Sequence, residues 1–281
     1  RFGDGSVEGW LERWRALRDA LPDSPLVTMG AALHSVRAVS PDEMATAVSG
    51  LPERVPIHIH VSEQPRENTE CLAAHGLTPT AVLDRAGALS DRTTIIHATH
   101  LTGGDIAMIA ASDTVVSLCP TTEADLGDGI ARVKDLQDAG VRMAIGTDED
   151  VITDPFTELR MLESTARLVT GTRGIIGCEA LWKIGTRNGV ESLRPAAEPL
   201  PRQTSTPGPG SAGLAAGDPA DIAVVEPSSA RLAGVDPTRW PLVATANDVA
   251  ATIVAGEWNR LDAAVAEDLR HVLDELRGRD S

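Results

Sequence analysis

The chain has 281 residues and a formal net charge of −16 at pH 7, which argues against a surface for nucleic acid or anionic membranes, because both need clustered positive charge. No apolar run approaches the roughly 20 residues of a membrane-spanning helix, and the charged opening residues do not resemble a secretory signal. We therefore expect a cytoplasmic protein with one large domain and an appendage.

The first predicted element is an amphipathic helix over residues 7–21, in which Trp10, Trp14 and Leu17 recur at helical spacing and which Pro22 ends. Beyond it, short apolar segments alternate with amphipathic helical patterns. The predicted strands are 26–33, 56–61, 93–98, 114–119 and 141–146. The predicted helices are 41–50, 65–75, 103–111, 129–139 and 155–169. This alternation is typical of a parallel α/β sheet or barrel.

A change in composition divides the chain into a domain at 1–194, a linker at 195–218 and a smaller part at 219–281. Pro, Gly, Ser and Thr dominate the linker. In the smaller part, ADIAVVEP and AATIVAGEWNR are predicted to be two strands of a small sheet. The apolar spacing of residues 261–276 predicts a terminal amphipathic helix.

Polar residues stand at the carboxyl ends of the predicted strands, where the working residues of an α/β barrel lie. They are His34 and Arg37, then His58, His60 and Glu63, then His97 and His100, and last Asp148. A single strand-end histidine is usually a packed or surface residue. Four successive strand ends that carry His or Asp favour a catalytic or metal site.

The HIHVSE segment combines a metal-ligand type with a proton-transfer type. His58 and His60 are two residues apart, so they point to the same side of their strand. The imidazole of His60 suits a divalent metal, and we expect a supporting role for His58. Glu63 lies just past the strand end, where a carboxylate can take a proton from a polarised water and return it to a leaving group.

The later strand ends leave alternatives open. His97 could ligate a metal or polarise the bond under attack, and we expect a structural role for His100 on the following loop. Asp148 could bind metal and accept a proton from water, or it could be a helix N-cap in a solvated acidic loop. Arg37 is either a loop salt bridge or a clamp for a substrate carboxylate.

The segment LCPTTEADLGDG is predicted to be a turn-rich loop after a strand. Its Cys119 is interpreted as a small buried residue rather than a nucleophile, because nothing around it indicates a lowered pKa. The three cysteines of the chain are odd in number and far apart, which is typical of a reduced protein without a disulfide framework.

These motifs resemble the amidohydrolase superfamily, in which His, His and Asp stand at strand ends in this order with HxxE on the earlier strand. HIHVSEQ, IIHATHLT and LCPTTEADLGDG are most similar to N-formimidoyl-L-glutamate deiminases, enzymes of histidine breakdown. The resemblance covers residues 1–190 well and the tail loosely. It implies an α/β fold, a partial (β/α)8 TIM barrel of the metal-dependent hydrolase type with a small β-sandwich remnant and a C-terminal helix.

The resemblance also implies roles for individual residues. His60 and Asp148 would be ligands of zinc, with one divalent ion per complete site. Glu63 would shuttle protons, and His97 would hydrogen-bond the reacting group. His34 and Arg37 would hold the carboxylates of a dicarboxylic substrate. The implied reaction is hydrolytic deimination of N-formimidoyl-L-glutamate to N-formyl-L-glutamate and ammonia.

The chain departs from the family pattern in two places. Glu149 and Asp150 follow the strand-end Asp, where family members usually have His and Ser. The family's first strand, with its HxH pair of metal ligands, is also missing, and the chain opens at Arg1 rather than Met. We therefore expect that the remaining barrel strands come from the same, longer chain or from a second chain, for which a homodimer is one arrangement.

Two other functions compete with deimination of a dicarboxylic substrate. The first is another deaminase or hydrolase of the superfamily that acts on a nucleobase-like or guanidine-like compound. Arg37 separates the two, because a dicarboxylate needs this cation and a neutral base does not. The second is an inactive remnant that serves as a binding or structural subunit, which the missing strands and the altered GTDED loop favour.

Overall fold

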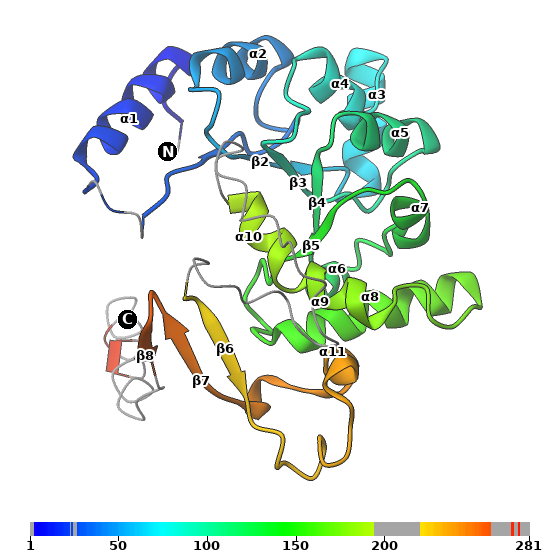
Figure 1. Ribbon diagram of the computed structural model, residues 1–281. Coiled ribbons are helices and arrows are strands. Elements are labelled where there is room, and N and C mark those ends of the chain that lie inside the picture. The colour runs from blue at the N-terminus through cyan, green and yellow to red at the C-terminus, as the bar shows by residue number, and fades with distance from the viewer. Residues whose placement is uncertain are drawn as a thin grey trace.

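The computed structural model describes residues 3–22, 24, 27–193, 220–259, 271, 272 and 275. Five parallel strands lie side by side in chain order (Figure 1). They are β1 (Ala31–Ala32), β2 (Ile57–Val61), β3 (Thr93–His97), β4 (Val115–Leu118) and β5 (Met143–Ile145). This arrangement, with helices between successive strands, confirms the predicted α/β class and is that of a partial barrel.

The helices match the sequence pattern closely where they are long. They are α1 (Val7–Ala20), α2 (Pro41–Gly50), α3 (Pro65–His75), α4 (Pro79–Arg85), α5 (Gly103–Ala111), α6 (Pro120–Asp125), α7 (Val133–Asp138), α8 (Pro155–Thr170), α9 (Cys178–Ile184) and α10 (Arg187–Leu193). Capping boxes fix two of the starts, at Ser40 with Glu43 and at Thr102 with Asp105. A capping box satisfies two otherwise unpaired amides and so favours a helix start at that position. Both observed starts agree with the predicted ones.

Several predicted boundaries are corrected by the structure. The strand expected at 26–33 is reduced to β1 in its described part, because β1 takes its ladder bonds from β2 alone. The helix expected at 129–139 begins only at Val133. The prediction of a turn-rich loop over LCPTTEADLGDG is wrong, because α6 begins directly after Cys119. The short helices α4, α9 and α10 were not predicted.

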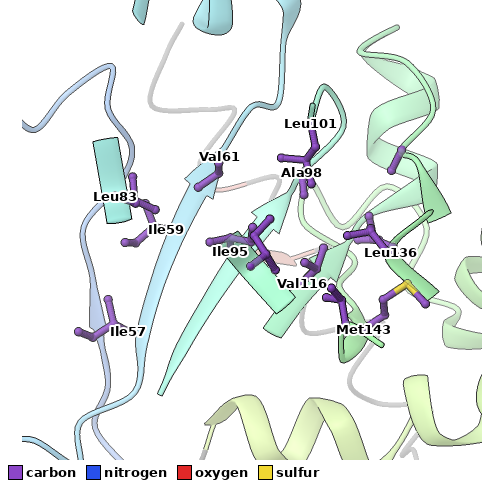
Figure 2. Packing of buried hydrophobic residues seen from close by; sticks show 14 of the residues in the cluster. Ile57, Ile59, Val61, Leu83, Ile95, Ala98, Leu101, Val116, Leu136 and Met143 are labelled. Carbon is purple, nitrogen blue, oxygen red and sulfur yellow. The ribbon is translucent and has the colours of Figure 1, made fainter. Parts of the chain in front are cut away.

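One face of the sheet is covered by helices and forms the main core. Along β2, Ile57, Ile59 and Val61 are buried, whereas His58 and His60 on the opposite face are half-buried. Figure 2 shows the three aliphatic residues along β2 among the other buried side chains of this cluster. The alternation confirms that the two histidines share one side of the strand.

Helix α10 covers part of the histidine face of the sheet. Asn188 donates a hydrogen bond to the carbonyl oxygen of Met143 in β5 at 2.7 Å. His58 Nε2 lies 3.0 Å from the carbonyl oxygen of Ser192 at the end of α10. Because a carbonyl only accepts, His58 donates this bond, which is the supporting role expected of it.

The second sheet is antiparallel and has three strands, β6 (Ile222–Val225), β7 (Val249–Val254) and β8 (Glu257–Asn259). The prediction of one strand over AATIVAGEWNR is therefore wrong. Ala255 and Gly256 have φ of 51° and 84°, so they form a tight turn with left-handed backbone at both positions. This turn folds the segment back on itself as a β7–β8 hairpin.

The polypeptide between β6 and β7 packs against the barrel part. It contains η1 (Pro237–Arg239), α11 (Trp240–Val243) and η2 (Ala246–Asp248). Arg160 of α8 donates to the carbonyl oxygens of Leu242 at 3.0 Å and Ala244 at 2.7 Å. Phe156, Leu232 and Ala244 form a second buried apolar cluster beside these bonds. Apolar packing and hydrogen bonds therefore join the two parts.

Two predicted segments fall largely outside the described residues. The linker at 195–218 lies wholly outside them, and so the division at 194 stays a prediction. Of the predicted terminal helix at 261–276, only His271, Val272 and Glu275 are described, all as helical. Within the described part of the chain, no helix is long and apolar enough to cross a membrane.

Candidate metal centre

The predicted site residues lie where the parallel strands end, and the backbone there is unusual. His34, Ser62, His97, Ala98 and Asp148 all have positive φ, between 46° and 70°. Non-glycine residues rarely adopt this conformation, and each costs on the order of 1–3 kcal/mol. Such strain collects at functional sites, where the surrounding structure holds it in place.

Three of the predicted residues form one group of potential metal donors. Nitrogen atoms of His60 and His97 and a carboxylate oxygen of Asp148 all lie within 4.8 Å of one another. The His60 and His97 rings are stacked with their centroids 5.6 Å apart. His97 Nε2 lies 4.0 Å from Asp148 Oδ2. Two imidazoles and a carboxylate are a donor set that suits zinc, so these residues fit the ion that the family resemblance implies.

The orientation of the His60 ring favours ligation through Nε2. Its Nδ1 lies 3.1 Å from the carbonyl oxygen of His34. A carbonyl cannot donate, so Nδ1 carries the proton and Nε2 keeps its lone pair. Burial lowers the pKa of His60, as do the neighbouring rings of His97 and His34. Both effects favour the neutral imidazole, the form that binds a metal.

Glu63 stands between Arg37 and His97. Arg37 Nη2 donates to Glu63 Oε2 at 2.5 Å, and Glu63 Oε1 lies 3.9 Å from His97 Nε2. Arg37 also donates from Nε to the Ser35 hydroxyl at 3.2 Å. The loop salt bridge left open for Arg37 is therefore present. His34 lies beside this group, with its ring centroid 5.4 Å from that of His60.

Glu67, a residue that was not predicted, fixes the loop that carries Glu63. Its buried carboxylate accepts hydrogen bonds from the backbone amides of Ser62 at 3.0 Å and Glu63 at 3.1 Å. Burial raises the pKa of Glu67, although these amides and Arg37 act in the opposite direction. Its place in the first turn of α3, directly after the strand end, was the available sequence signal.

A second unpredicted carboxylate, Glu123, faces the other side of His97. Glu123 Oε1 lies 3.5 Å from His97 Nδ1 and accepts the backbone amide of Cys119 at 2.9 Å. Burial lowers the pKa of His97, but the carboxylates of Glu123, Glu63 and Asp148 outweigh it and raise that pKa overall. The signal was the LCPTTEADLGDG motif, in which Glu123 had no assigned role.

Cys119 is buried in the same region and has no sign of an activated thiol. Burial raises its pKa well above the usual range, and the carboxylates of Glu123, Asp148 and Glu158 act in the same direction. A thiol that keeps its proton is a poor nucleophile. The structure therefore agrees with the interpretation of Cys119 as a small buried residue.

In the acidic loop after β5, Asp148 has a different role from the acidic residues that follow it. The N-cap of α8 is Asp154, whose side chain accepts the amide of Phe156 at 3.0 Å, so the N-cap alternative for Asp148 is wrong. Asp150 accepts the hydroxyl of Thr147 at 2.7 Å. Among the described residues, Glu149 and Asp150 do not join the donor group.

His100, on the loop after β3, bonds the carbonyl oxygen of Asp128 at 2.7 Å. This is a structural contact, as expected of His100.

Comparisons with known proteins point to one family. A model of the amidohydrolase family matches residues 2–194. Formimidoylglutamate deiminase from Pseudomonas aeruginosa is 33% identical over 99% of this chain and 59% of its own length. A 5-methylthioadenosine/S-adenosylhomocysteine deaminase from Halobacterium salinarum is 29% identical over 88% of this chain and 57% of its own length. The chain thus spans about three-fifths of the length of these curated relatives.

Solved structures resemble the fold over nearly the whole chain. A crystal structure of an amidohydrolase from Brucella melitensis has a TM-score of 0.80 and 26% identity, and it covers 97% of this chain and 60% of its own. An adenosine deaminase from Xanthomonas campestris with bound zinc has a TM-score of 0.77 and 23% identity, and covers 96% of this chain and 62% of its own. The second likeness concerns the fold alone.

Proposed function

The chain belongs to the amidohydrolase family, and from this we propose that it carries the water-activating and proton-transferring side of a hydrolytic deaminase site. One observation supports this function above all. Donor atoms of His60, His97 and Asp148 converge within 4.8 Å at the carboxyl ends of parallel strands, with Glu63 beside them. A group of this composition suits metal-assisted hydrolysis of a C–N bond.

The metal we propose is zinc, held by His60 and Asp148 from this chain. Zinc supplies Lewis acidity that lowers the pKa of water and so provides a nucleophile near neutral pH. The bond from His60 Nδ1 to the carbonyl of His34 aims Nε2 of His60 for ligation. The further ligands would come from the remaining part of the barrel, in the same chain or in a second one.

The chain's own residues divide the proton transfers between them. Asp148 accepts a proton from the attacking water. His97 Nε2 lies 3.9 Å from Glu63 and 4.0 Å from Asp148, so it faces the space between these two carboxylates. The group under attack lies in that space, and His97 hydrogen-bonds it there. Water supplies both protons that the departing imino nitrogen gains: Glu63 passes on one and Asp148 returns the other, so the nitrogen leaves as ammonia and both carboxylates are regenerated. The ion pair with Arg37 holds Glu63 in place between these steps.

The substrate we propose is N-formimidoyl-L-glutamate, converted with water to N-formyl-L-glutamate and ammonia. The likeness to the Pseudomonas aeruginosa deiminase over 99% of the chain supports it. So does the presence of His34 and Arg37 at the site. A guanidinium has five N–H donors, and its bonds to Glu63 and Ser35 leave others for a substrate carboxylate.

A nucleoside-type deaminase is the second candidate, favoured by the deaminase relative from Halobacterium salinarum. The test uses the full-length protein with zinc and measures ammonia release from N-formimidoyl-L-glutamate and from 5-methylthioadenosine. Release from the first compound alone supports our proposal, and release from the second alone supports the rival. Silence with both, in a folded and zinc-loaded protein, would indicate an inactive remnant.

Arg37→Ala refines this test. Loss of a charged partner for a substrate carboxylate should raise KM for N-formimidoyl-L-glutamate by about tenfold or more. Arg66→Ala is the matched control, since Arg66 is exposed and pairs with Glu70. An unchanged KM in Arg37→Ala would contradict the role of Arg37 in binding the dicarboxylate.

A further inference from the structure

His97 is held with its two nitrogens in different surroundings. The residue is 1% exposed, and its backbone has φ of 70°. Nε2 faces Glu63 and Asp148, whereas Nδ1 faces Glu123 on the opposite side. Among the described residues, Nδ1 has no partner within ordinary hydrogen-bond geometry, and Glu123 Oε1 is its neighbour at 3.5 Å. A buried nitrogen of this kind needs a partner.

Glu123 is itself fixed and buried. Its side chain is 5% exposed, and Oε1 accepts the amide of Cys119 at 2.9 Å. Its own amide donates to the carbonyl of Cys119 at 3.0 Å, so the residue is tied to the end of β4 at two points. A buried carboxylate with one amide partner has acceptor capacity left, and the nitrogen in front of it is His97 Nδ1.

We propose that Glu123 is a positioning residue for His97. It accepts a hydrogen bond from Nδ1–H of His97 and so sets the rotation of the ring that keeps Nε2 toward Glu63 and Asp148. The separation of 3.5 Å is longer than a formed N–H···O bond, which is usually about 2.7–3.2 Å. Hydrogen bonds at catalytic sites are often long before substrate binds and tighten in the complex.

The catalytic consequence rests on the proposed function, but the contact itself can be tested without turnover. An ionised carboxylate only accepts, so Glu123 requires a proton on Nδ1 of His97. Because the same atom, Oε1, accepts the Cys119 amide and faces Nδ1, a glutamine with its carbonyl at this place still accepts a hydrogen bond from Nδ1–H. Glu123→Leu removes the acceptor, so it should move the proton of neutral His97 from Nδ1 to Nε2, which faces the carboxylates of Glu63 and Asp148.

Glu158 provides a matched control from the same region. It is 0% exposed, and its carboxylate accepts the amide of Thr121 at 3.1 Å as well as the Thr121 hydroxyl. It therefore holds the first turn of α6, the helix that carries Glu123. Among the described residues, the carboxylates within 4.0 Å of a His97 nitrogen are Glu63, Glu123 and Asp148. Glu158→Gln should thus leave the His97 ring unchanged.

The experiment labels the histidines of the metal-free chain with ¹⁵N and records the ring nitrogen shifts, with His97 assigned from His97→Asn. We expect a protonated Nδ1 in the wild type, in Glu123→Gln and in Glu158→Gln, and a protonated Nε2 in Glu123→Leu. Unmoved His97 shifts in Glu123→Leu, or equal shifts in Glu123→Leu and Glu158→Gln, would overturn the proposal. If Glu123→Leu does not fold, the wild-type spectrum decides by itself, because His97 shifts with Nδ1 unprotonated would overturn the proposal.

Kinetics of the full-length protein then separate the two proposals. Glu123→Leu should lower kcat by about a hundredfold or more and leave KM within about twofold, because a ring in the wrong tautomer no longer serves the reacting group. Glu123→Gln, which keeps the acceptor, should restore part of kcat. A silent wild-type enzyme would contradict the proposed function while leaving the NMR result intact, and full activity in Glu123→Leu would overturn only the role of Glu123.

Discussion

The substitution Glu67→Ala should lower the free energy of unfolding of the chain, because Glu67 holds the loop between β2 and α3. The carboxylate accepts the buried amides of Ser62 and Glu63 and lies 3.8 Å from Nε of Arg37. A buried donor left without a partner costs about 1–3 kcal/mol, so two of them should lower the free energy of unfolding by about 2–6 kcal/mol. Glu67→Gln keeps one acceptor and removes the cost of a buried charge, so about 1–2 kcal/mol is expected for it.

Urea unfolding followed by circular dichroism at pH 7 measures both losses. The matched control is Glu70→Ala on the same helix, since Glu70 forms an exposed ion pair with Arg66. Pairs of that kind contribute little to stability, because solvent screens both charges. A loss in Glu67→Ala below about 1 kcal/mol, or no larger than in Glu70→Ala, would refute the reasoning that the two amides depend on Glu67.

Further predictions concern the core, the metal and the pH. Ile59→Ala, at a position 1% exposed, should cost about 2–5 kcal/mol in urea unfolding, whereas Leu72→Ala, 57% exposed, should cost about 0.5 kcal/mol or less. Asp148→Asn should weaken zinc binding about tenfold or more by calorimetry, and equal weakening in Asp150→Asn would contradict the assigned ligand. Burial raises the folded-state pKa of Glu158 above its usual value of 4.5, so its contribution to stability is full below that value and is lost as pH rises through the folded pKa. Wild type should therefore lose stability relative to Glu158→Gln as the pH rises above 4.5, and a constant difference would speak against this.

The sequence alone predicted the elements whose patterns are local. Alternation in HIHV puts His58 and His60 on one side of β2, and the apolar run of TTIIH ends on His97. Because parallel strands end at the same edge of a sheet, the convergence of His60, His97 and Asp148 follows from their positions at strand ends. The capping boxes likewise fix helix starts within four residues of sequence.

The tertiary structure decided which side chains support these residues. Glu67 and Glu123 come from helices that follow the strands, and the direction of their carboxylates depends on how α3 and α6 pack. The β7–β8 hairpin likewise depends on a turn at Ala255 and Gly256 that lacks the Asn-Gly or Asp-Gly signal. Strand and helix periods report only neighbours in sequence, whereas Glu123 in α6, after β4, meets His97 at the end of β3 through the packing of the sheet, a contact that no local pattern records.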